Sequence, residues 1–296
     1  MSFSKKMGLR YMLDKDTVIY HYCSVEAFVN ILKTNSIWLT HAREMNDTLE
    51  DEYFSAPLKK ALQSFNDISE SEQDLLQQII SAYLERVTFP YVACFSREDD
   101  VLSQWRAYAD DGRGIAIGFK VGAIPHVDLF RRQYGEDSDS LIIIDEVSYK
   151  HADDEVQFMQ KVLSACLINY RKTNDKATVI KQGICALSML SIYSKGKGFE
   201  EEQEIRLVFY PSYRDLVANL NCEPPCGEDA AKIQFRVRDG RIISYFPFTF
   251  CINAIQSITL GPKCSVDFSQ LALFLNQYAP KIRINNAICK SKISYR

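Results

Sequence analysis

The sequence has no long apolar segment and no excess of charge of either sign. No apolar run approaches the roughly 18 residues that a membrane-spanning helix requires, and the charged stretch at 1–16 has no apolar signal-peptide core. The sequence has 35 basic and 38 acidic residues, so its formal net charge is −3. No global field therefore attracts nucleic acid or an anionic membrane. We therefore expect a cytoplasmic protein with no membrane partner.

Cysteine is present but follows no disulfide or zinc pattern. The nine cysteines are spread from Cys23 to Cys289, and only Cys222 and Cys226 lie close together. That pair, in CEPPC, has no second pair and no nearby histidines at metal spacing. Several other cysteines lie in apolar runs, where a free thiol packs as a small hydrophobic side chain. We therefore expect reduced thiols, as in the cytoplasm, and no metal site.

Three common enzyme motifs are also missing. The sequence has no phosphate loop, no GxGxxG after a predicted strand and no HExxH. The glycines and lysines of SKGKGFE lack phosphate-loop spacing, and a nucleophilic Cys94 would need a placed histidine that no motif identifies. A catalytic site must therefore be recognised from other residues.

Apolar and aromatic residues are plentiful. Of the 296 residues, 47% are apolar and 12% aromatic, which is enough for a substantial core. The length fits one large α+β domain or one domain with a long insertion, and nothing marks a linker clearly. Strand and helix signals alternate without a repeat period.

Local patterns predict the elements of this domain. Ser24 is a candidate N-cap for a short helix, and the dipeptide DG at 239–240 suits a tight hairpin turn. Strands are predicted at 17–22, 36–40, 91–96, 114–120, 141–149, 205–210, 232–248 (a hairpin) and 254–262. Longer helices are predicted at about 49–86 (broken near 64–74), 102–110, 155–172, 177–193 and 267–278. We expect a single α+β domain over 1–296, with a mixed or antiparallel sheet, a helical insertion at about 49–86 and a helical segment at about 155–193.

Three polar clusters contain residue types that are unusual for purely structural positions. The first is YHYCS, which contains His21, Tyr22 and Ser24. The second is CFSREDDVLSQWRAYADDGRG, which brings four side chains to the end of a strand and the following helix: Ser96, Trp105, Arg106 and Tyr108. The third is KGKGFEEEQEIRLV, where a period of two places Glu202, Glu204 and Arg206 on one face at a strand entrance.

Each cluster has a structural alternative. His21 is either a satisfied core histidine or a ligand-binding residue. Trp105 and Tyr108 are either part of a core stripe or a stacking platform. Glu204 and Arg206 are either a solvated ion pair at the sheet edge or, with Glu202, part of a functional site, because two carboxylates stay ionised together only when the arginine or a ligand group offsets their repulsion.

The motifs together resemble the bacterial domain of unknown function 2971 family. The matching segments are IYHYCS, ILKTNSIWLT, ND, CFS, SQWRAYADDGRGIAIGF, the K, F and EQEIRLV of the third cluster, and ITLGP, in order from about Ile19 to Pro262. The family pattern has proline where this chain has Thr48, and tryptophan where it has Phe199 and Ile205. These departures leave five polar residues in place: His21, Arg106, Glu202, Glu204 and Arg206.

The opening segment IYHYCSVEAFVNILKTNSIW is also similar to DNA-modifying ADP-ribosyltransferase toxins. This resemblance implies a split, largely antiparallel sheet in which His21 contacts the nicotinamide ribose of NAD⁺. It implies that Glu204 is catalytic and that Glu202 engages the acceptor or supports Glu204. Further NAD⁺-binding residues implied by it are Tyr22, Ser24, Ser96, Trp105, Tyr108 and Arg206, with Arg106 as first choice for the pyrophosphate and Arg43 as second.

The chemistry of NAD⁺ cleavage fits such a residue set. Breaking the bond between nicotinamide and ribose passes through an oxocarbenium-like state, which a facing carboxylate stabilises without a metal. We therefore expect an NAD⁺-dependent ADP-ribosyltransferase, a toxin or phage-defence effector that modifies a nucleic-acid or protein acceptor and has an antitoxin as a candidate partner. The alternatives are an inactive binding or antitoxin-like module of the same fold, and a metal-dependent nuclease that uses Glu202 and Glu204.

Overall fold

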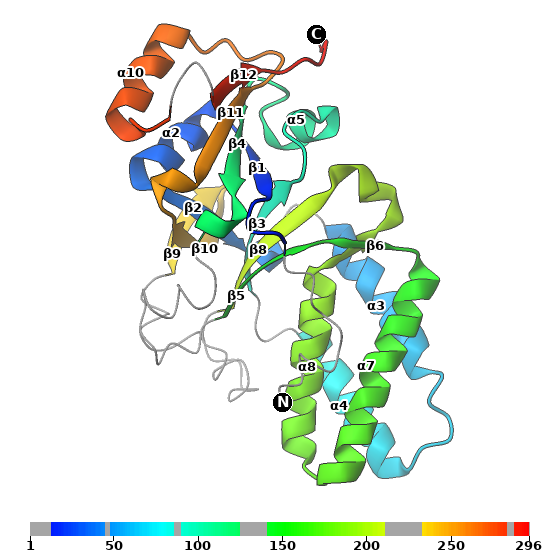
Figure 1. Cartoon of the computed structure of the whole chain (residues 1–296). Helices are drawn as coiled ribbons and strands as arrows, with labels where there is room; N and C mark the ends of the chain where they lie inside the picture. The colour runs from blue at the N-terminus through cyan, green and yellow to red at the C-terminus, as the bar shows by residue number, and fades with distance from the viewer. Residues whose placement is uncertain are drawn as a thin grey trace.

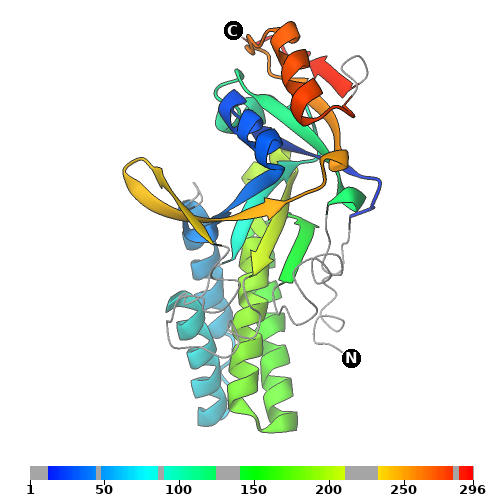
Figure 2. The same ribbon diagram turned by 90° about the vertical axis from the view of Figure 1, so that its left-hand side faces the viewer.

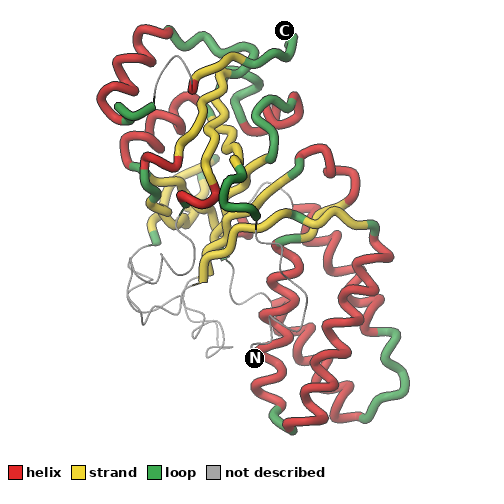
Figure 3. Tube along the Cα trace, viewed as in Figure 1, coloured by secondary structure: helices red, strands yellow, loops and turns green. Residues whose placement is uncertain are grey.

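The computed structural model describes residues 13–44, 48–85, 90–124, 141–210, 233–282 and 287–295. Over these residues the chain forms a ten-stranded sheet and a group of long helices that extends from one end of it (Figures 1 and 3). All neighbouring strands of this sheet are antiparallel except β11 and β12. The predicted α+β class with a mixed, largely antiparallel sheet is confirmed.

The order of the strands shows a branch in the sheet. The main path runs β12-β11-β4-β1-β3-β2-β10-β9, while β8 pairs with β3 and β5 pairs with β8. The strands are β1 (Val18–Cys23), β2 (Ser36–His41), β3 (Tyr91–Ser96), β4 (Ile115–Lys120), β5 (Leu141–Glu146), β8 (Glu204–Tyr210), β9 (Gln234–Arg238), β10 (Arg241–Thr249), β11 (Ile255–Leu260) and β12 (Ile288–Lys290).

The branch splits one edge of β3 between two strands. At one end of β3, Ser96 faces Tyr20 of β1. At the other end, Val92 faces Thr40 of β2. The middle of that edge, around Cys94, has neither neighbour, whereas β8 pairs along the whole of the opposite edge. β1 and β2 therefore diverge from each other over the centre of β3.

A short helix connects the two diverging strands. In α2 (Val25–Thr34), the N-cap Ser24 accepts a hydrogen bond from the backbone N–H of Ala27 at 3.1 Å. The C-cap Asn35 has a φ of 49°, the left-handed conformation that commonly ends helices. The buried face of α2 packs on the main core. The predicted N-cap is confirmed, and the helix connects β1 to β2.

The main hydrophobic core lies on one face of the sheet, under α2 and α10 (Phe268–Tyr278). In β8, Ile205, Leu207 and Phe209 point into this core. The intervening side chains of β8 point to the opposite face and begin with Glu204 and Arg206, both buried. Strand alternation thus places two charged side chains on the face that adjoins the long helices.

The long helices form a four-helix bundle with its own core (Figures 1 and 2). They are α3 (Thr48–Leu62), α4 (Glu70–Glu85), α7 (Ala152–Thr173) and α8 (Lys176–Ile192). Two short parallel strands, β6 (Ser148–Lys150) and β7 (Ser194–Gly196), lie where the bundle meets the sheet. The helices predicted at 49–86 and 155–193 are confirmed as elements, and their assignment to a single domain stays a prediction.

Smaller elements complete the described part of the chain. The hairpin between β9 and β10 turns at Asp239 and Gly240, with φ values of 51° and 74°, as predicted from the DG dipeptide. The strand predicted at 141–149 is instead two, because the chain leaves the sheet at Val147. No helix among the described residues is long and apolar enough to cross a membrane. The CEPPC segment lies outside the described residues.

Candidate active site at the split of the sheet

A pocket of about 180 Å³ opens beside the split. Its walls come from β1, β2 and β3 around the divergence, from β7, β8 and β9, and from α5 (Leu102–Tyr108). His21 and Glu204, which the sequence places 183 positions apart (204 minus 21), both line it. Tyr22, Tyr108 and Arg206 line it as well. The structure therefore brings five of the predicted site residues to one pocket.

His21 completes the edge of β3 at the split. Its Nδ1 lies 3.0 Å from the carbonyl oxygen of Cys94, in the middle of the stretch of β3 that faces neither β1 nor β2. An N–H on Nδ1 therefore donates the hydrogen bond that a neighbouring strand would otherwise supply. Burial lowers the pKa of His21 below its usual value, so the ring is neutral near pH 7. With the proton on Nδ1, Nε2 is a hydrogen-bond acceptor.

The two alternatives for His21 are therefore compatible in this geometry. The ring is satisfied by the backbone of β3 and packs 5.4 Å from the ring of Phe95, as a core histidine would. His21 is also one of the residues that line the pocket. Its hydrogen bond to the backbone fixes its orientation at the pocket wall.

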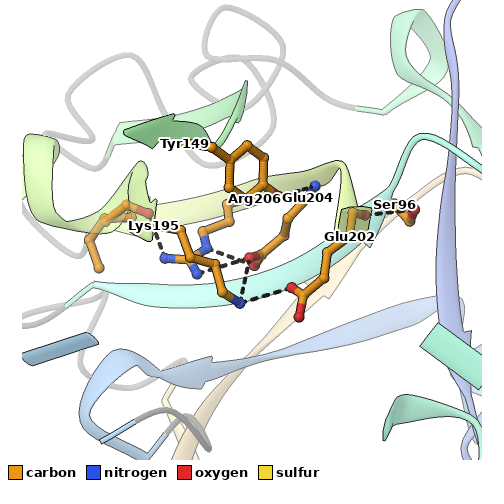
Figure 4. A network of polar contacts seen from close by, with 7 residues as sticks. Ser96, Tyr149, Lys195, Glu202, Glu204 and Arg206 are labelled. Atoms are coloured by element: carbon orange, nitrogen blue, oxygen red, sulfur yellow. Dashed lines mark hydrogen bonds and ion pairs between the residues drawn. The ribbon is translucent and has the colours of Figure 1, made fainter. Parts of the chain in front are cut away.

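Glu204 lies in a buried network of charges (Figure 4). Arg206 donates from Nε to Oε1 at 2.7 Å and from Nη2 to Oε2 at 3.0 Å. Lys195 of β7 donates from Nζ to Glu204 Oε2 at 3.3 Å and to Glu202 Oε2 at 2.9 Å. The alternative of a solvated ion pair at the sheet edge is wrong, because Glu204 is 6% exposed and Arg206 is 2% exposed.

Backbone contacts fix the position of each group in this network. The N–H of Glu204 donates to the hydroxyl of Tyr149 at 2.7 Å. Arg206 Nη1 donates to the carbonyl of Ile192, the last residue of α8, at 2.7 Å. These contacts attach the start of β8 both to β6 and to the end of the bundle.

Glu202 reaches the network by a different route from the one predicted. It ends the short 3₁₀ helix η3 (Lys197–Glu202), and the chain then turns at Gln203, whose φ is 43°. Glu202 therefore lies before β8, which begins at Glu204, one residue earlier than the predicted start at 205. Lys195 nevertheless bridges the two carboxylates, and Ser96 Oγ donates to the carbonyl of Glu202 at 3.0 Å.

The network stabilises the ionised form of Glu204. Burial by itself raises the pKa of this carboxyl, but Arg206, Lys195 and the Cys94 thiol outweigh burial and bring it to about 2. Two carboxylates and two cations form the network, so its formal charge is zero near pH 7. The pocket therefore contains a fixed carboxylate in a region largely shielded from water.

Helix α5 divides its side chains between the pocket and the core. Gln104 and Tyr108, four residues apart, line the pocket. Trp105 is fully buried, packs edge-on against Tyr22 at 4.7 Å and donates from Nε1 to Asp100 Oδ1 at 2.8 Å. The core alternative is therefore confirmed for Trp105, whereas Tyr108 is 41% exposed and lines the pocket.

Three other predicted ligand residues lie elsewhere, and a fourth is not described. Arg106 is exposed and does not line the pocket; at about 100° per residue it points away from Gln104 and Tyr108 on α5. Ser24 caps α2, and Ser96 is buried against the loop that carries Glu202, so both have structural roles. The side chain of Arg43 lies outside the described part of the structure.

The sequence patterns missed three residues that matter for the pocket. Lys195 bridges the two carboxylates, but its segment SKGKG gives no reason to separate it from the exposed Lys197. Trp38 and Arg238 also line the pocket. Arg238 could have been found from the segment QFRVR, because strand alternation places its two arginines on one face.

The site contains no evident metal centre within the described residues. No group of three or more histidine, cysteine, aspartate or glutamate side chains in that part of the chain is arranged to hold an ion. Between Glu202 and Glu204, where a divalent ion would bridge two carboxylates, lies the ammonium group of Lys195.

Comparison with known proteins gives one match. Residues 104–207 match the model of a family described as "Protein of unknown function (DUF2971)". No curated protein and no solved structure matches the chain. The matched segment runs from α5 to β8 and contains Tyr108, Lys195, Glu202, Glu204 and Arg206. The chain is therefore similar to this family over the segment that supplies the charged network of the pocket.

Proposed function

We propose that this protein is an NAD⁺-dependent ADP-ribosyltransferase, of the kind used as a bacterial toxin or phage-defence effector, with its site in the pocket at the split. One observation carries the proposal. His21 on β1 and the ionised Glu204 at the start of β8 line the same pocket, where a largely antiparallel sheet divides.

The pocket residues suit the steps of NAD⁺ cleavage. Nε2 of His21 accepts a hydrogen bond from a ribose hydroxyl, and the ring of Tyr108 stacks on nicotinamide. As the bond from ribose C1′ to the nicotinamide nitrogen breaks, that bond's electron pair leaves with neutral nicotinamide. The Glu204 carboxylate stabilises the positive charge that develops on the ribose. An acceptor nucleophile then bonds to C1′ and gives its proton to Glu202.

The volume of the pocket limits which part of NAD⁺ it encloses. Sites that enclose drug-sized ligands measure about 300–1,000 Å³, whereas this one measures about 180 Å³. We therefore infer that it takes the nicotinamide riboside half, and that the diphosphate and adenosine lie along its outer wall.

A binding module without catalysis is the second candidate, and one observation favours it. Both carboxylate oxygens of Glu204 already accept hydrogen bonds from Arg206, and Oε2 also accepts one from Lys195. A carboxylate so fully compensated stabilises an oxocarbenium ion less than an unpaired one. The nuclease alternative is disfavoured, because an ion between the two glutamates would be repelled by Lys195.

Nicotinamide release tests the proposal directly. The protein is incubated with NAD⁺, alone and with bacterial nucleic acid or cell extract, and free nicotinamide is measured. Glu204→Asp keeps the charge that Arg206 requires but withdraws the carboxylate by one methylene. We expect it to lower the rate by roughly 10²-fold or more. The matched control is Glu201→Gln, which neutralises an exposed carboxylate in the same 3₁₀ helix and should leave the rate unchanged.

The outcomes separate the three functions. The transferase is abandoned if the wild type releases no nicotinamide under any condition and calorimetry detects no binding of NAD⁺. Binding of NAD⁺ without release identifies the binding module. Activity that a chelator abolishes supports the nuclease instead.

A further inference from the structure

Two neighbouring arginines on β9 lie at the pocket, one in its wall and one beside it. Arg238 lines the pocket, and Arg236 lies two residues earlier on the same face of the strand. Both are half-buried, whereas Phe235 and Val237 on the opposite face are 67% and 75% exposed. The β9–β10 hairpin that carries them projects from the body of the sheet (Figure 2). The arginines thus face the site, and the apolar side chains face solvent.

Neither arginine has an acidic partner among the described residues. Arg238 Nη2 donates to the backbone carbonyl of Glu44 at 2.5 Å. Arg236 Nη2 donates to Thr40 Oγ1 at 3.0 Å, while its Nε is buried without a hydrogen-bond partner. No carboxylate in the described ranges forms an ion pair with either guanidinium, although Arg241 on the same hairpin is paired with Glu44. Within the described part of the chain, two adjacent cations, one in the pocket wall and one beside it, therefore have no ion-paired carboxylate.

This arrangement is unfavourable in the absence of a ligand. Burial and the neighbouring Arg238 both lower the pKa of Arg236, which shows that its charge is poorly compensated. Partly buried charges are normally paired, and a donor without a partner costs free energy. An anion bound between the two guanidinium groups would supply both the missing charge and the missing acceptor.

An aromatic surface lies next to the two arginines. Trp38 lines the pocket and stacks on Tyr245, with ring centroids 4.3 Å apart and planes 29° apart. The guanidinium carbon of Arg236 lies 5.5 Å from the centroid of Trp38 and 5.9 Å from that of Tyr245. These contacts hold Arg236 in place and give the wall an apolar surface beside its positive charge.

We propose that Arg236 and Arg238 form an anion subsite for the diphosphate of the dinucleotide whose other end occupies the pocket. The identity of the dinucleotide rests on the proposed function, whereas the anion subsite rests on the arginines alone. Guanidinium groups bind phosphate oxygens through paired, charge-assisted hydrogen bonds, which suits them to a diphosphate. Arg236 and Arg238 thus take the role that the sequence assigned to Arg106.

Binding measurements with three probes test the subsite. Inorganic pyrophosphate, ADP and adenosine are titrated by calorimetry into the whole protein. ADP and adenosine share a base and a ribose, so the difference between their affinities reports the diphosphate contact. We expect the wild type to bind pyrophosphate, and to bind ADP at least about tenfold more tightly than adenosine. Raising the salt concentration should weaken the binding of ADP but not that of adenosine, because ions screen the charge contacts.

Variants then assign the contact to the two arginines. Arg238→Gln and Arg236→Gln should each lower the affinity for ADP and for pyrophosphate by roughly tenfold. The affinity for adenosine should stay unchanged. Arg238→Lys should restore part of the affinity, because it keeps the charge but loses the fork of donors. The control is Arg113→Gln, which removes an exposed arginine paired with Asp110 away from the pocket. Thermal unfolding of each variant checks that it is folded.

The results separate this inference from the proposed function. If pyrophosphate does not bind, or if ADP binds both arginine variants as tightly as wild type, the subsite is refuted even where nicotinamide is released. If NAD⁺ is not cleaved but ADP binding depends on Arg236 and Arg238, the subsite stands and the transferase does not. If the salt dependence of ADP binding equals that of adenosine in the wild type, the subsite is refuted without any variant.

Discussion

Glu204 and Arg206 depend on each other at the residue scale. Removing the charge of Glu204 would leave one excess positive charge in the network, because only Glu202 would then offset Arg206 and Lys195, in a region that is 2–6% exposed. Breaking such a buried pair costs more than the pair itself contributes. A variant that neutralises Glu204 could therefore lose activity because it unfolds and not because it lacks the catalytic group. Glu204→Asp keeps the charge and is the better test of catalysis.

His21 gives a prediction about stability and pH. Burial lowers its pKa in the folded protein below the usual 6.5, so unfolding lets the ring bind a proton. Its contribution to stability is therefore present above about pH 6.5 and is lost as the pH falls towards its folded pKa. We expect the melting temperature of the wild type to fall between about pH 7.5 and about pH 5.5 by more than that of His21→Gln.

The comparison with His21→Gln isolates this residue from the other titrating groups. Glutamine keeps an N–H that reaches the Cys94 carbonyl but does not titrate. Asp145 acts in the opposite direction, because burial raises its pKa to about 6, and it is present in both proteins. Circular dichroism measures the melting temperatures. Equal acid shifts in the two proteins would show that His21 is not a buried neutral ring.

At the element scale, the sequence predicted those strands, caps and turns that depend only on neighbouring residues. The strand at 91–96, the cap at Ser24 and the turn at Asp239 and Gly240 follow from residues within a few positions, and the structure has all three. Lys195 could not be predicted, because its burial depends on β6, β8 and the end of α8 meeting around it.

Arg106 and Arg238 show that the sequence could not predict which arginine lines the pocket. The sequence analysis chose Arg106 and missed Arg238, although Arg238 lines the pocket and Arg106 does not. Only the helical phase of α5 turns Arg106 outwards, and only the position of β9 next to β10, which in turn pairs with β2, brings Arg238 to the wall. The residue types of the site were predictable, whereas the choice between equivalent arginines required the tertiary structure.

The contact between α4 and α8 gives a prediction about the bundle. A Cβ at Gly183 would lie 2.8 Å from Ile79 Cγ2 and 2.9 Å from Ile79 Cδ1. Alanine usually stabilises a helix by about 1 kcal/mol relative to glycine, but overpacking a core costs about 1–3 kcal/mol. We therefore expect Gly183→Ala to lower the free energy of unfolding by about 1 kcal/mol, measured by urea denaturation.

Two further variants check the cause. Gly198→Ala places a Cβ where no atom lies within 4 Å and should change stability by less than about 0.5 kcal/mol. Ile79→Val removes the Cδ1 atom. It should lower the free energy of unfolding by less in the Gly183→Ala variant than in wild type. Additive effects of Ile79→Val and Gly183→Ala would show that the helices do not meet at this point.

At the scale of the whole molecule, the pocket lies where two hydrophobic cores meet. One core lies under the sheet and the other inside the bundle. A small cluster that contains Val92, Val208 and Tyr210 packs with Met189 and Ile192 at the end of α8. The charged network reinforces this junction, because Lys195 follows the bundle and Arg206 donates to the carbonyl of Ile192. The site and the cohesion of the two parts therefore depend on the same residues.

This junction predicts how the protein unfolds. Both tryptophans, Trp38 and Trp105, lie in the sheet region, whereas most of the helix lies in the bundle. Tryptophan fluorescence therefore reports the sheet, and far-ultraviolet circular dichroism reports mainly the bundle. In wild type we expect the two urea transitions to coincide, as for a cooperative unit. In Lys195→Met, Glu202 and Glu204 lose their shared cation, so the sheet should unfold at lower urea than the bundle.

The matched control for this measurement is Lys197→Met. It removes an exposed lysine two residues away that pairs only with Glu200 at the surface. It should leave the two transitions coincident, because an exposed pair contributes about 0–1 kcal/mol. If Lys195→Met shifts both transitions equally, the network stabilises the protein without linking its parts. If wild type already shows two separate transitions, the sheet and the bundle are independent folding units, and the pocket lies at the boundary between them.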